Sequence, residues 1–407
     1  MDSQVIKEFE NRVRKELDGD IIPFWSTKAI DEENGGFIGK MTNDGTIDKK
    51  ASKGLILNTR ILWTFSALYV FEKKPELLKL ADREYDYLMK HFWDDQFGGM
   101  FWLVDWQGKP LEQQKQIYGQ GFVIYCLSEY YRASGNKEAL AKAKEVFDLL
   151  EKHVWDKQYK GYFESYERNW DKSKVQQLSS GDMPVAKGMN TSLHVLEGIA
   201  NLYDVDKDTL VGQRVEDMLG IFADFILHPY GTYEQLFFDE KWYPKSERIS
   251  FGHDIEASWL LYRDAEILGK PKMVEKIRRM SLKLAEFTYQ NGLDDKKSMF
   301  YEAEPVGISN SQKDWWVQGE AVVGYLNAYQ LTGRQEYFDV AQNIWQFIED
   351  YVVDKENGEW FWRIDAKGNV DNSNPKVSEW KCPYHNSRAC IETIQRLEKI
   401  QRLADSV

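Results

Sequence analysis

Cysteine is scarce in this chain of 407 residues, which contains only Cys126, Cys382 and Cys390. Three widely separated cysteines are too few for a disulfide framework or a Cys-rich zinc site. No apolar run approaches the roughly 18 residues of a membrane span, and the first residues lack the basic and apolar segments of a secretory signal. The net charge of −13 disfavours nucleic acid and anionic membranes as partners. We therefore expect a cytoplasmic protein, as a monomer or homodimer.

Motifs for common cofactors are also missing. The sequence has no GxxxxGK[ST] phosphate loop, no dinucleotide fingerprint and no HExxH zinc motif. No serine stands in a nucleophile elbow. A bound nucleotide, a nicotinamide and a catalytic metal ion are each disfavoured, so we expect an enzyme without a cofactor.

The chain does contain a degenerate repeat. At intervals of roughly sixty to seventy residues, a helical stretch ends in a short turn that reads acid–glycine–aromatic. The six copies begin at Asp31, Asp94, Asp156, Tyr230, Asp294 and Asp354. The fourth copy lacks the acid, and the fifth has Ser298 in place of glycine. Because the repeat runs from end to end, we expect residues 1–407 to form one domain.

Helical periodicity predicts two helices for each repeat. The expected ranges are 2–19, 53–72, 76–92, 116–134, 136–153, 187–203, 207–228, 252–268, 271–291, 313–332, 335–352 and 380–403. Short aromatic runs beside the turns are typical of small hairpins. Twelve helices in six antiparallel pairs predict an all-α protein, an (α/α)6 barrel with hairpins at one end.

The helices that follow the hairpins begin with the most reactive side chains of the chain. These are Asn58, Arg60, Tyr118, Asn190, His194, His253, Glu256, Trp316, Glu320, Trp380 and His385. A barrel that gathers six such helix starts makes one pocket from them. Of the six histidines, the other three, His91, His153 and His228, end helices, where a cation suits the dipole. Asp254 and Glu320 could instead simply complement helix N-termini.

Two histidines on facing helices favour proton transfer at neutral pH. One can remove a proton from a carbon next to a carbonyl while the other returns a proton to the opposite face. Carbon C2 of an open-chain sugar is such a centre. Hydrolysis of a glycosidic bond would instead need two carboxylates beside that bond. A glycoside hydrolase or lyase is therefore the alternative that two close carboxylates in the pocket would favour.

Several segments are similar to those of the cellobiose 2-epimerases, within the N-acylglucosamine 2-epimerase superfamily. They are Leu57–Trp63, Met189–His194, Ser250–Ala257, Trp315–Ala321 and Trp380–Asn386. The resemblance covers essentially the whole chain and implies the same (α/α)6 barrel. It also implies that His253 and His385 are the acid/base pair at C2, and that His194 assists ring opening.

The resemblance assigns substrate contacts as well. It implies that Arg60, Tyr118 and Asn190 hold the oxygens of the reacting sugar, and that Glu256 orients a neighbouring histidine. By the same match, two tryptophans stack on the reducing sugar and the next ring, and one loop residue reaches toward the sugar. These are Trp316, Trp380 and Asp182.

The implied reaction is epimerisation at C2 of β-1,4-linked disaccharides through a cis-enediolate. Cellobiose would give glucosyl-mannose, and lactose and mannobiose should also fit. The run 180–188 is less charged than the family leads us to expect. Since relatives act on free mannose and glucose, a mannose 2-epimerase or an aldose–ketose isomerase is the main alternative.

Overall fold

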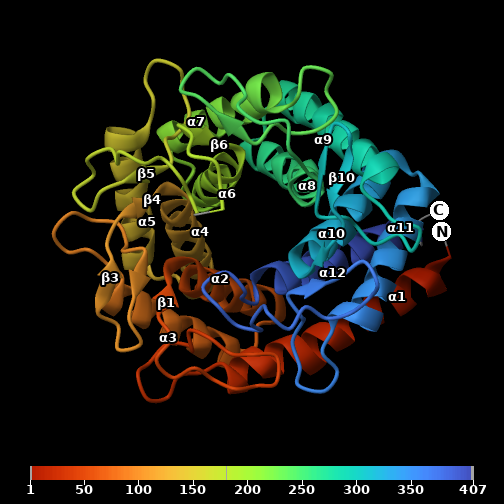
Figure 1. Ribbon diagram of the computed structural model, residues 1–407, viewed down its shortest axis with the longest axis horizontal. Coiled ribbons are helices and arrows are strands. Elements are labelled where there is room, and N and C mark those ends of the chain that lie inside the picture. The colour runs from red at the N-terminus through yellow and green to blue at the C-terminus, as the bar shows by residue number, and fades with distance from the viewer. Residues whose placement is uncertain (1, 180, 405–407) are drawn as a thin grey trace.

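The computed structural model describes residues 2–179 and 181–404, whose helices form two concentric rings (Figure 1). The inner ring consists of α2 (Leu55–Glu72), α4 (Ile117–Ser134), α6 (Met189–Asp206), α8 (Phe251–Leu268), α10 (Trp315–Thr332) and α12 (Tyr384–Ala404). The outer ring consists of α1 (Ser3–Glu16), α3 (Pro75–His91), α5 (Lys137–Leu149), α7 (Thr209–Ile221), α9 (Pro271–Asn291) and α11 (Gln335–Phe347). The predicted (α/α)6 barrel is confirmed.

Burial explains which helices lie inside. In α2, every residue from Leu55 to Leu68 is buried, as expected for a helix that is packed on all sides. The outer helices bury one face only; α3 buries Leu77, Ala81 and Leu88 and exposes charged residues elsewhere. Several outer helices continue directly into a π-helical turn, and after α1 a second π-helical turn follows the first. These segments are Leu17–Ile21, Phe24–Lys28, Leu150–Val154, Phe222–Ile226 and Ile348–Val352.

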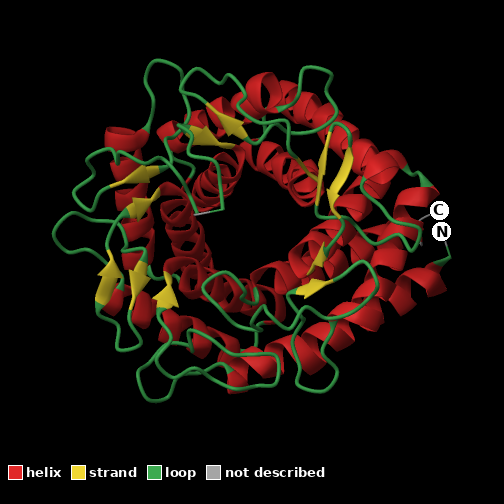
Figure 2. Cartoon of the chain, viewed as in Figure 1, coloured by secondary structure: helices red, strands yellow, loops and turns green. Residues whose placement is uncertain are grey.

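Short antiparallel strands join neighbouring units at one end of the barrel (Figure 2). They are β1 (Lys53–Gly54), β2 (Leu103–Val104), β3 (Pro110–Glu112), β4 (Lys115–Gln116), β5 (Ser165–Tyr166), β6 (Lys187–Gly188), β7 (Phe237–Phe238), β8 (Ile249–Ser250), β9 (Glu302–Glu304), β10 (Gly307–Asn310), β11 (Lys313–Asp314) and β12 (Arg363–Ile364). The sheet orders are β1-β2-β3, β4-β5, β6-β7, β10-β9-β8 and β11-β12. In one pair, Lys115 lies opposite Tyr166, so the strand before α4 pairs with the strand after α5.

The repeated acids have a structural role that the sequence reading did not assign. In five units, one carboxylate oxygen of the turn aspartate accepts backbone N–H bonds within the turn, and the other binds a buried lysine. The pairs are Asp31–Lys53, Asp94–Lys115, Asp156–Lys187, Asp294–Lys313 and Asp354–Lys376. Four of these lysines begin the strand that leads into an inner helix. In the fourth unit, His228 stands where the other units have the acid, since its backbone N–H makes the equivalent bond to the carbonyl of Tyr233, and Ile249 begins the strand.

The strands fix where the inner helices begin. Because β1, β4, β6, β8 and β11 each run directly into an inner helix, the N-termini of these helices gather at the hairpin end of the barrel. Within the described ranges, no helix combines the length and the apolar character needed to cross a bilayer.

Candidate active site

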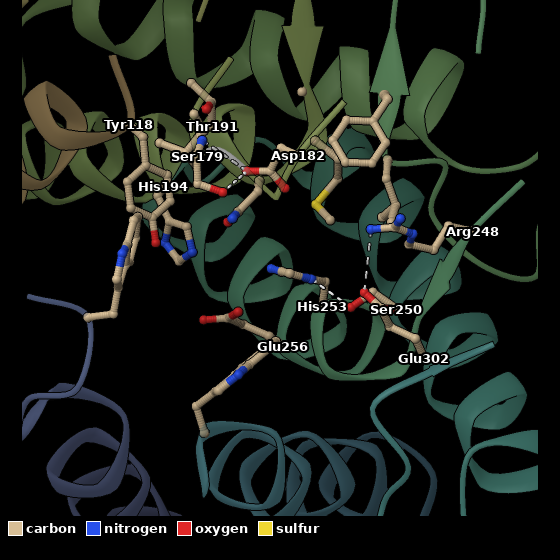
Figure 3. A pocket seen from close by; sticks show the side chains of 18 of the residues that line it. Tyr118, Ser179, Asp182, Thr191, His194, Arg248, Ser250, His253, Glu256 and Glu302 are labelled. Atoms are coloured by element: carbon tan, nitrogen blue, oxygen red, sulfur yellow. Dashed lines mark hydrogen bonds and ion pairs between the residues drawn. The ribbon is translucent and has the colours of Figure 1, made fainter. Parts of the chain in front are cut away.

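A cavity of about 360 Å³ lies at the N-terminal ends of the inner helices. The structure places ten predicted site residues on its wall: Arg60, Tyr118, Asp182, Asn190, His194, His253, Glu256, Trp316, Trp380 and His385. They come from all six inner helices and the adjoining loops. Figure 3 shows Tyr118 and His194 on one side and Arg248 and Glu302 on the other. Asn58 is different: it is buried, and its amide donates to the carbonyl of Gly54 at 2.7 Å instead of lining the cavity.

His385 is held by a carboxylate. Its Nδ1 lies 2.7 Å from Oε1 of Glu320, whose Oε2 accepts a hydrogen bond from Trp259 at 3.0 Å. A carboxylate can only accept here, so Nδ1 has the proton and the Nε2 lone pair is left as a base. Burial, together with the charges of Arg60 and Arg388, holds the pKa of His385 well below its usual range. Glu320 therefore does more than complement a helix N-terminus.

His194 has the same kind of partner. Its Nδ1 lies 2.9 Å from Oε2 of Glu197, three residues further along α6. Burial lowers the pKa of His194, and the contact with Glu197 opposes this only in part. Burial alone would raise the pKa of Glu197, but the charge of Arg388 and the bond from His194 hold it far below its ordinary value. Glu197 thus keeps its charge and fixes the tautomer of His194.

His253 has a more adaptable partner. Its Nδ1 lies 2.7 Å from the hydroxyl of Ser250, which can donate or accept. Burial lowers the pKa of His253 to about 3, and nearby His194 adds to the effect. The imidazole is therefore neutral in the unliganded cavity. When the protonation of this ring changes, the hydroxyl can keep the hydrogen bond by switching between donor and acceptor.

Arg60 supplies the positive charge of the cavity. Its guanidinium donates to the hydroxyl of Tyr118 at 2.8 Å and lies over the rings of Phe122 and Tyr384. The residue is only 3% exposed, and its Nε has no hydrogen-bond partner among the described residues. A buried cation between aromatic rings is suited to stabilise a developing oxyanion.

Three acidic side chains meet one arginine beneath the cavity. Arg388 binds Glu197, Glu256 and Glu320, each of which is 1% exposed. Burial, followed by the charge of Glu320, raises the pKa of Glu256 to about 8, with Arg388 opposing. Oε2 of Glu256 has no hydrogen-bond partner in the part of the chain that the structure describes, so a neutral Glu256 offers a hydrogen-bond donor at the cavity wall.

The sequence reading missed Arg388 and Glu197. The available signal was spacing, because each lies three residues after a histidine and so on the same helical face. The sequence also led us to expect that Glu256 orients a histidine, whereas in the structure Glu256 accepts a hydrogen bond from Arg388. Asp254, another residue considered, bonds the backbone N–H of Glu234 at 2.8 Å and stands outside the cavity lining.

Aromatic rings surround the histidines. The ring of Trp316 lies 4.9 Å from that of His253 and 5.6 Å from that of His385. Since α10 stands between α8 and α12, the two histidines flank this tryptophan. Trp380 contacts Tyr118 and Trp102, both with centroids 5.9 Å away, and remains partly exposed toward the opening.

Residues 181–188 contribute part of the rim. Asp182 accepts a bond from the hydroxyl of Ser179 at 2.7 Å, and Arg248 lies beside Glu302 at 3.9 Å (Figure 3). Ser180, at the start of the run 180–188, lies outside the described residues. The rim therefore offers polar groups to any part of a ligand that extends beyond the histidines.

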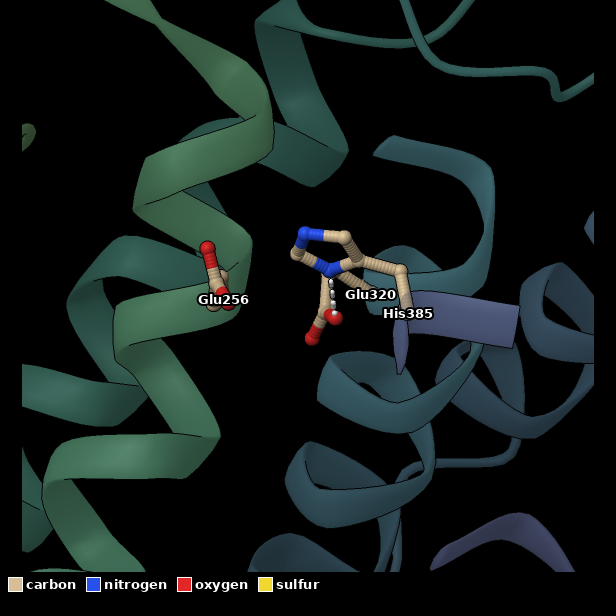
Figure 4. A group of neighbouring side chains, drawn as sticks. All are labelled: Glu256, Glu320 and His385. Atoms are coloured by element: carbon tan, nitrogen blue, oxygen red, sulfur yellow. Dashed lines mark hydrogen bonds and ion pairs between the residues drawn. The ribbon is translucent and has the colours of Figure 1, made fainter. Parts of the chain in front are cut away.

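A metal ion has one candidate position among the described residues. Potential ligand atoms of Glu256, Glu320 and His385 lie within 4.8 Å of one another (Figure 4). The guanidinium of Arg388 already contacts both carboxylates, and Nδ1 of His385 is bound to Glu320. This cluster therefore has its cation in Arg388, and a divalent ion would have to displace it.

Comparisons with known proteins give matches over most of the chain. A sequence profile of the N-acylglucosamine 2-epimerase (GlcNAc 2-epimerase) family matches residues 36–389. A cellobiose 2-epimerase from Bacteroides fragilis is 40% identical over 386 residues, covering 95% of this chain and 98% of that protein. The structure of a cellobiose 2-epimerase from Bacillus thermoamylovorans superposes with a TM-score of 0.92 at 36% identity, covering 96% and 100% of the two chains. A D-mannose isomerase structure matches with a TM-score of 0.83 at 22% identity, covering 95% and 98%, and so shares the fold.

Proposed function

The chain belongs to the N-acylglucosamine 2-epimerase family and is a carbohydrate epimerase, and we propose that it inverts C2 of the reducing-end sugar of β-1,4-linked disaccharides. Cellobiose, lactose and mannobiose are the proposed substrates. The observation that supports this most is the pair of neutral histidines, His253 and His385, on either side of Trp316 in one cavity.

The proposed reaction begins with ring opening, which exposes the C1 aldehyde. His194 assists this step, and Arg60 and Tyr118 bind the oxygens on which negative charge develops. One histidine then takes the C2 proton through its free nitrogen, which leaves a cis-enediolate. The other donates a proton to the opposite face of C2, and the C1–C2 double bond of the intermediate is lost as the new C–H bond forms.

The cavity must hold one proton that can be delivered. Because burial keeps both histidines neutral, we assign this proton to Glu256, whose pKa is about 8 and whose carboxyl group lies within 4.8 Å of a ring nitrogen of His385. Glu256 passes it to His385, His385 gives it to C2, and His253 retains the proton that it removed. Exchange with water in the open cavity returns the site to its starting state.

A second sugar ring has room on the opening side of the histidines. Trp380 offers a partly exposed aromatic face there, and Asp182, Arg248 and Glu302 offer polar contacts. Flat aromatic faces with polar groups around them suit a pyranose. This outer surface supports a disaccharide in preference to a free hexose.

The test is to incubate exhaustively chelated protein with cellobiose, lactose, mannobiose, mannose and N-acetylmannosamine, and to identify products by NMR. We expect C2 epimers of the disaccharides, without added metal or nucleotide. Products from mannose alone would replace this proposal with a mannose 2-epimerase or isomerase. Cleavage of the glycosidic bond would replace it with a hydrolase or lyase.

A further inference from the structure

Arg388, which takes no direct part in the reaction described above, lies at the centre of a buried ionic cluster. It stands three residues after His385 on α12 and is 1% exposed. Its Nη1 donates to Glu197 at 2.6 Å, and its Nη2 donates to Glu320 at 2.6 Å and also to Glu256. One guanidinium thus joins α6, α8 and α10 to α12.

Each of these carboxylates stands behind a different part of the site. Glu197 holds His194, Glu320 holds His385, and Glu256 reaches the cavity itself. A planar guanidinium with several donors can bind three carboxylates in fixed directions, whereas an ammonium is a single point of charge. The geometry of this cluster therefore requires arginine rather than any cation.

We propose that Arg388 is a positioning residue that locks His194 and His385 into one arrangement and sets the charge of the acid–base site. The proposal rests on the epimerase function proposed above. Arg388 acts through the three carboxylates, and its shape and its charge make separable contributions.

The charge contribution follows from the groups around the guanidinium. These are Arg60 on α2, Tyr125 on α4, His194 and Glu197 on α6, Glu256 and Asp264 on α8, Glu320 on α10, and Tyr384 and His385 on α12. Burial dominates the pKa of His385 and of Glu256, and the positive charge of Arg388 lowers both. Loss of that charge must raise both pKa values together.

Two substitutions separate shape from charge. Arg388→Lys keeps the charge but cannot hold three carboxylates, so kcat should fall about 10- to 100-fold, a typical loss for residues that orient reacting groups. KM and the pH limits of activity should stay near their original values. Arg388→Gln removes the charge, so both limbs of the pH profile of kcat/KM should move to higher pH.

Arg396→Lys is the matched control. Arg396 is two turns further along α12, and its guanidinium lies 5.9 Å from the Trp259 ring, compared with 4.9 Å for Arg388. It donates to Asn327 and Gln330 and to none of the three carboxylates. The control should therefore change neither kcat nor the pH limbs, whereas a purely packing role for Arg388 would make the two lysine variants alike.

A readout without substrate keeps this inference separate from the proposed function. In protein labelled with ¹⁵N-histidine, NMR should show Nδ1–H tautomers at His194 and His385, altered in Arg388→Lys and unchanged in Arg396→Lys. If Arg388→Lys has the original kcat and the original histidine spectra, the inference is overturned. If Arg388→Gln does not fold, the comparison of Arg388→Lys with Arg396→Lys still decides the question. If the unaltered protein epimerises no sugar, the proposed function fails, and the spectra alone decide the role of Arg388.

Discussion

The contact between Glu320 and His385 gives the sharpest quantitative prediction. Glu320 accepts from Nδ1 of His385 at 2.7 Å, and both side chains are buried. Glu320→Gln would leave an amide that cannot stabilise the imidazolium. Its NH₂ group would also face the donor N–H of Trp259, now 3.0 Å from Oε2. A hydrogen bond to a charged group is worth about 1.5–3 kcal/mol, so kcat/KM should fall about 10- to 150-fold.

The assay is the initial rate of cellobiose epimerisation, followed by NMR of the anomeric protons. Glu286→Gln is the control, because Glu286 also accepts a bond from a charged group, Arg334 at 2.6 Å, but does not line the cavity. Circular dichroism and thermal unfolding establish that both variants are folded. A kcat/KM for Glu320→Gln within about threefold of the original, or equal losses in the two variants, would refute the reasoning.

Three further predictions follow from the same structure. Trp380→Ala should remove a stacking face worth about 1–2 kcal/mol and should reduce kcat/KM more for cellobiose than for mannose; equal losses would show that Trp380 contacts only the reacting ring. The pH profile of kcat/KM should have a basic limb near 8, from Glu256, and an acid limb below the ordinary histidine pKa of about 6.5; an acid limb above 7 would contradict neutral histidines. Asp94→Asn should lower the free energy of unfolding by about 3–5 kcal/mol, because Lys115 would be left buried without this carboxylate, whereas Asp224→Asn, in an exposed pair, should cost about 0–1 kcal/mol.

The Asp94 prediction also has a pH dependence. Burial alone would raise the pKa of Asp94, but bonds from Arg168 and Lys115 lower it to about 2. A carboxyl whose pKa is lower in the folded state stabilises the fold above its unfolded pKa of about 3.9 and loses this contribution as the pH falls. The difference in stability between the original protein and Asp94→Asn should therefore shrink between about pH 4 and pH 2.

The helices and the cavity wall were predictable because their signals are local. The expected ranges 252–268 and 271–291 match α8 and α9 within one residue at each end. Polar and aromatic side chains at the starts of apolar helices marked the cavity, and nine of the ten predicted residues on its wall are of this kind, whereas Asp182 came only from the family resemblance. Asn58 fits the same pattern, yet its amide donates back to the carbonyl of Gly54 four residues earlier, an outcome that depends on side-chain direction rather than on spacing.

The groups that support the histidines were harder to predict from the sequence. Arg388 and Glu197 look like ordinary charged residues of a helix until the facing helices are known. The two residues bind each other, yet they lie 191 positions apart in the sequence. The buried lysines were easier to predict from the sequence. Lys53 and Lys115 each stand about twenty residues after a repeat acid, so a search for a second periodic residue type would have found them. Their pairing still depends on the fold, because only burial makes the ion pairs important.

The most direct test of the two-histidine mechanism is the fate of the C2 hydrogen. In heavy water, the unaltered protein should place deuterium at C2 of the epimerised product, because the proton delivered is not the one removed. A variant without His253 or without His385 should not epimerise, and each should exchange only the epimer whose C2 hydrogen faces the remaining histidine. If the product formed in heavy water kept its original C2 hydrogen in full, a single base or a hydride shift would be at work, and the account of His253 and His385 as opposed bases would be contradicted.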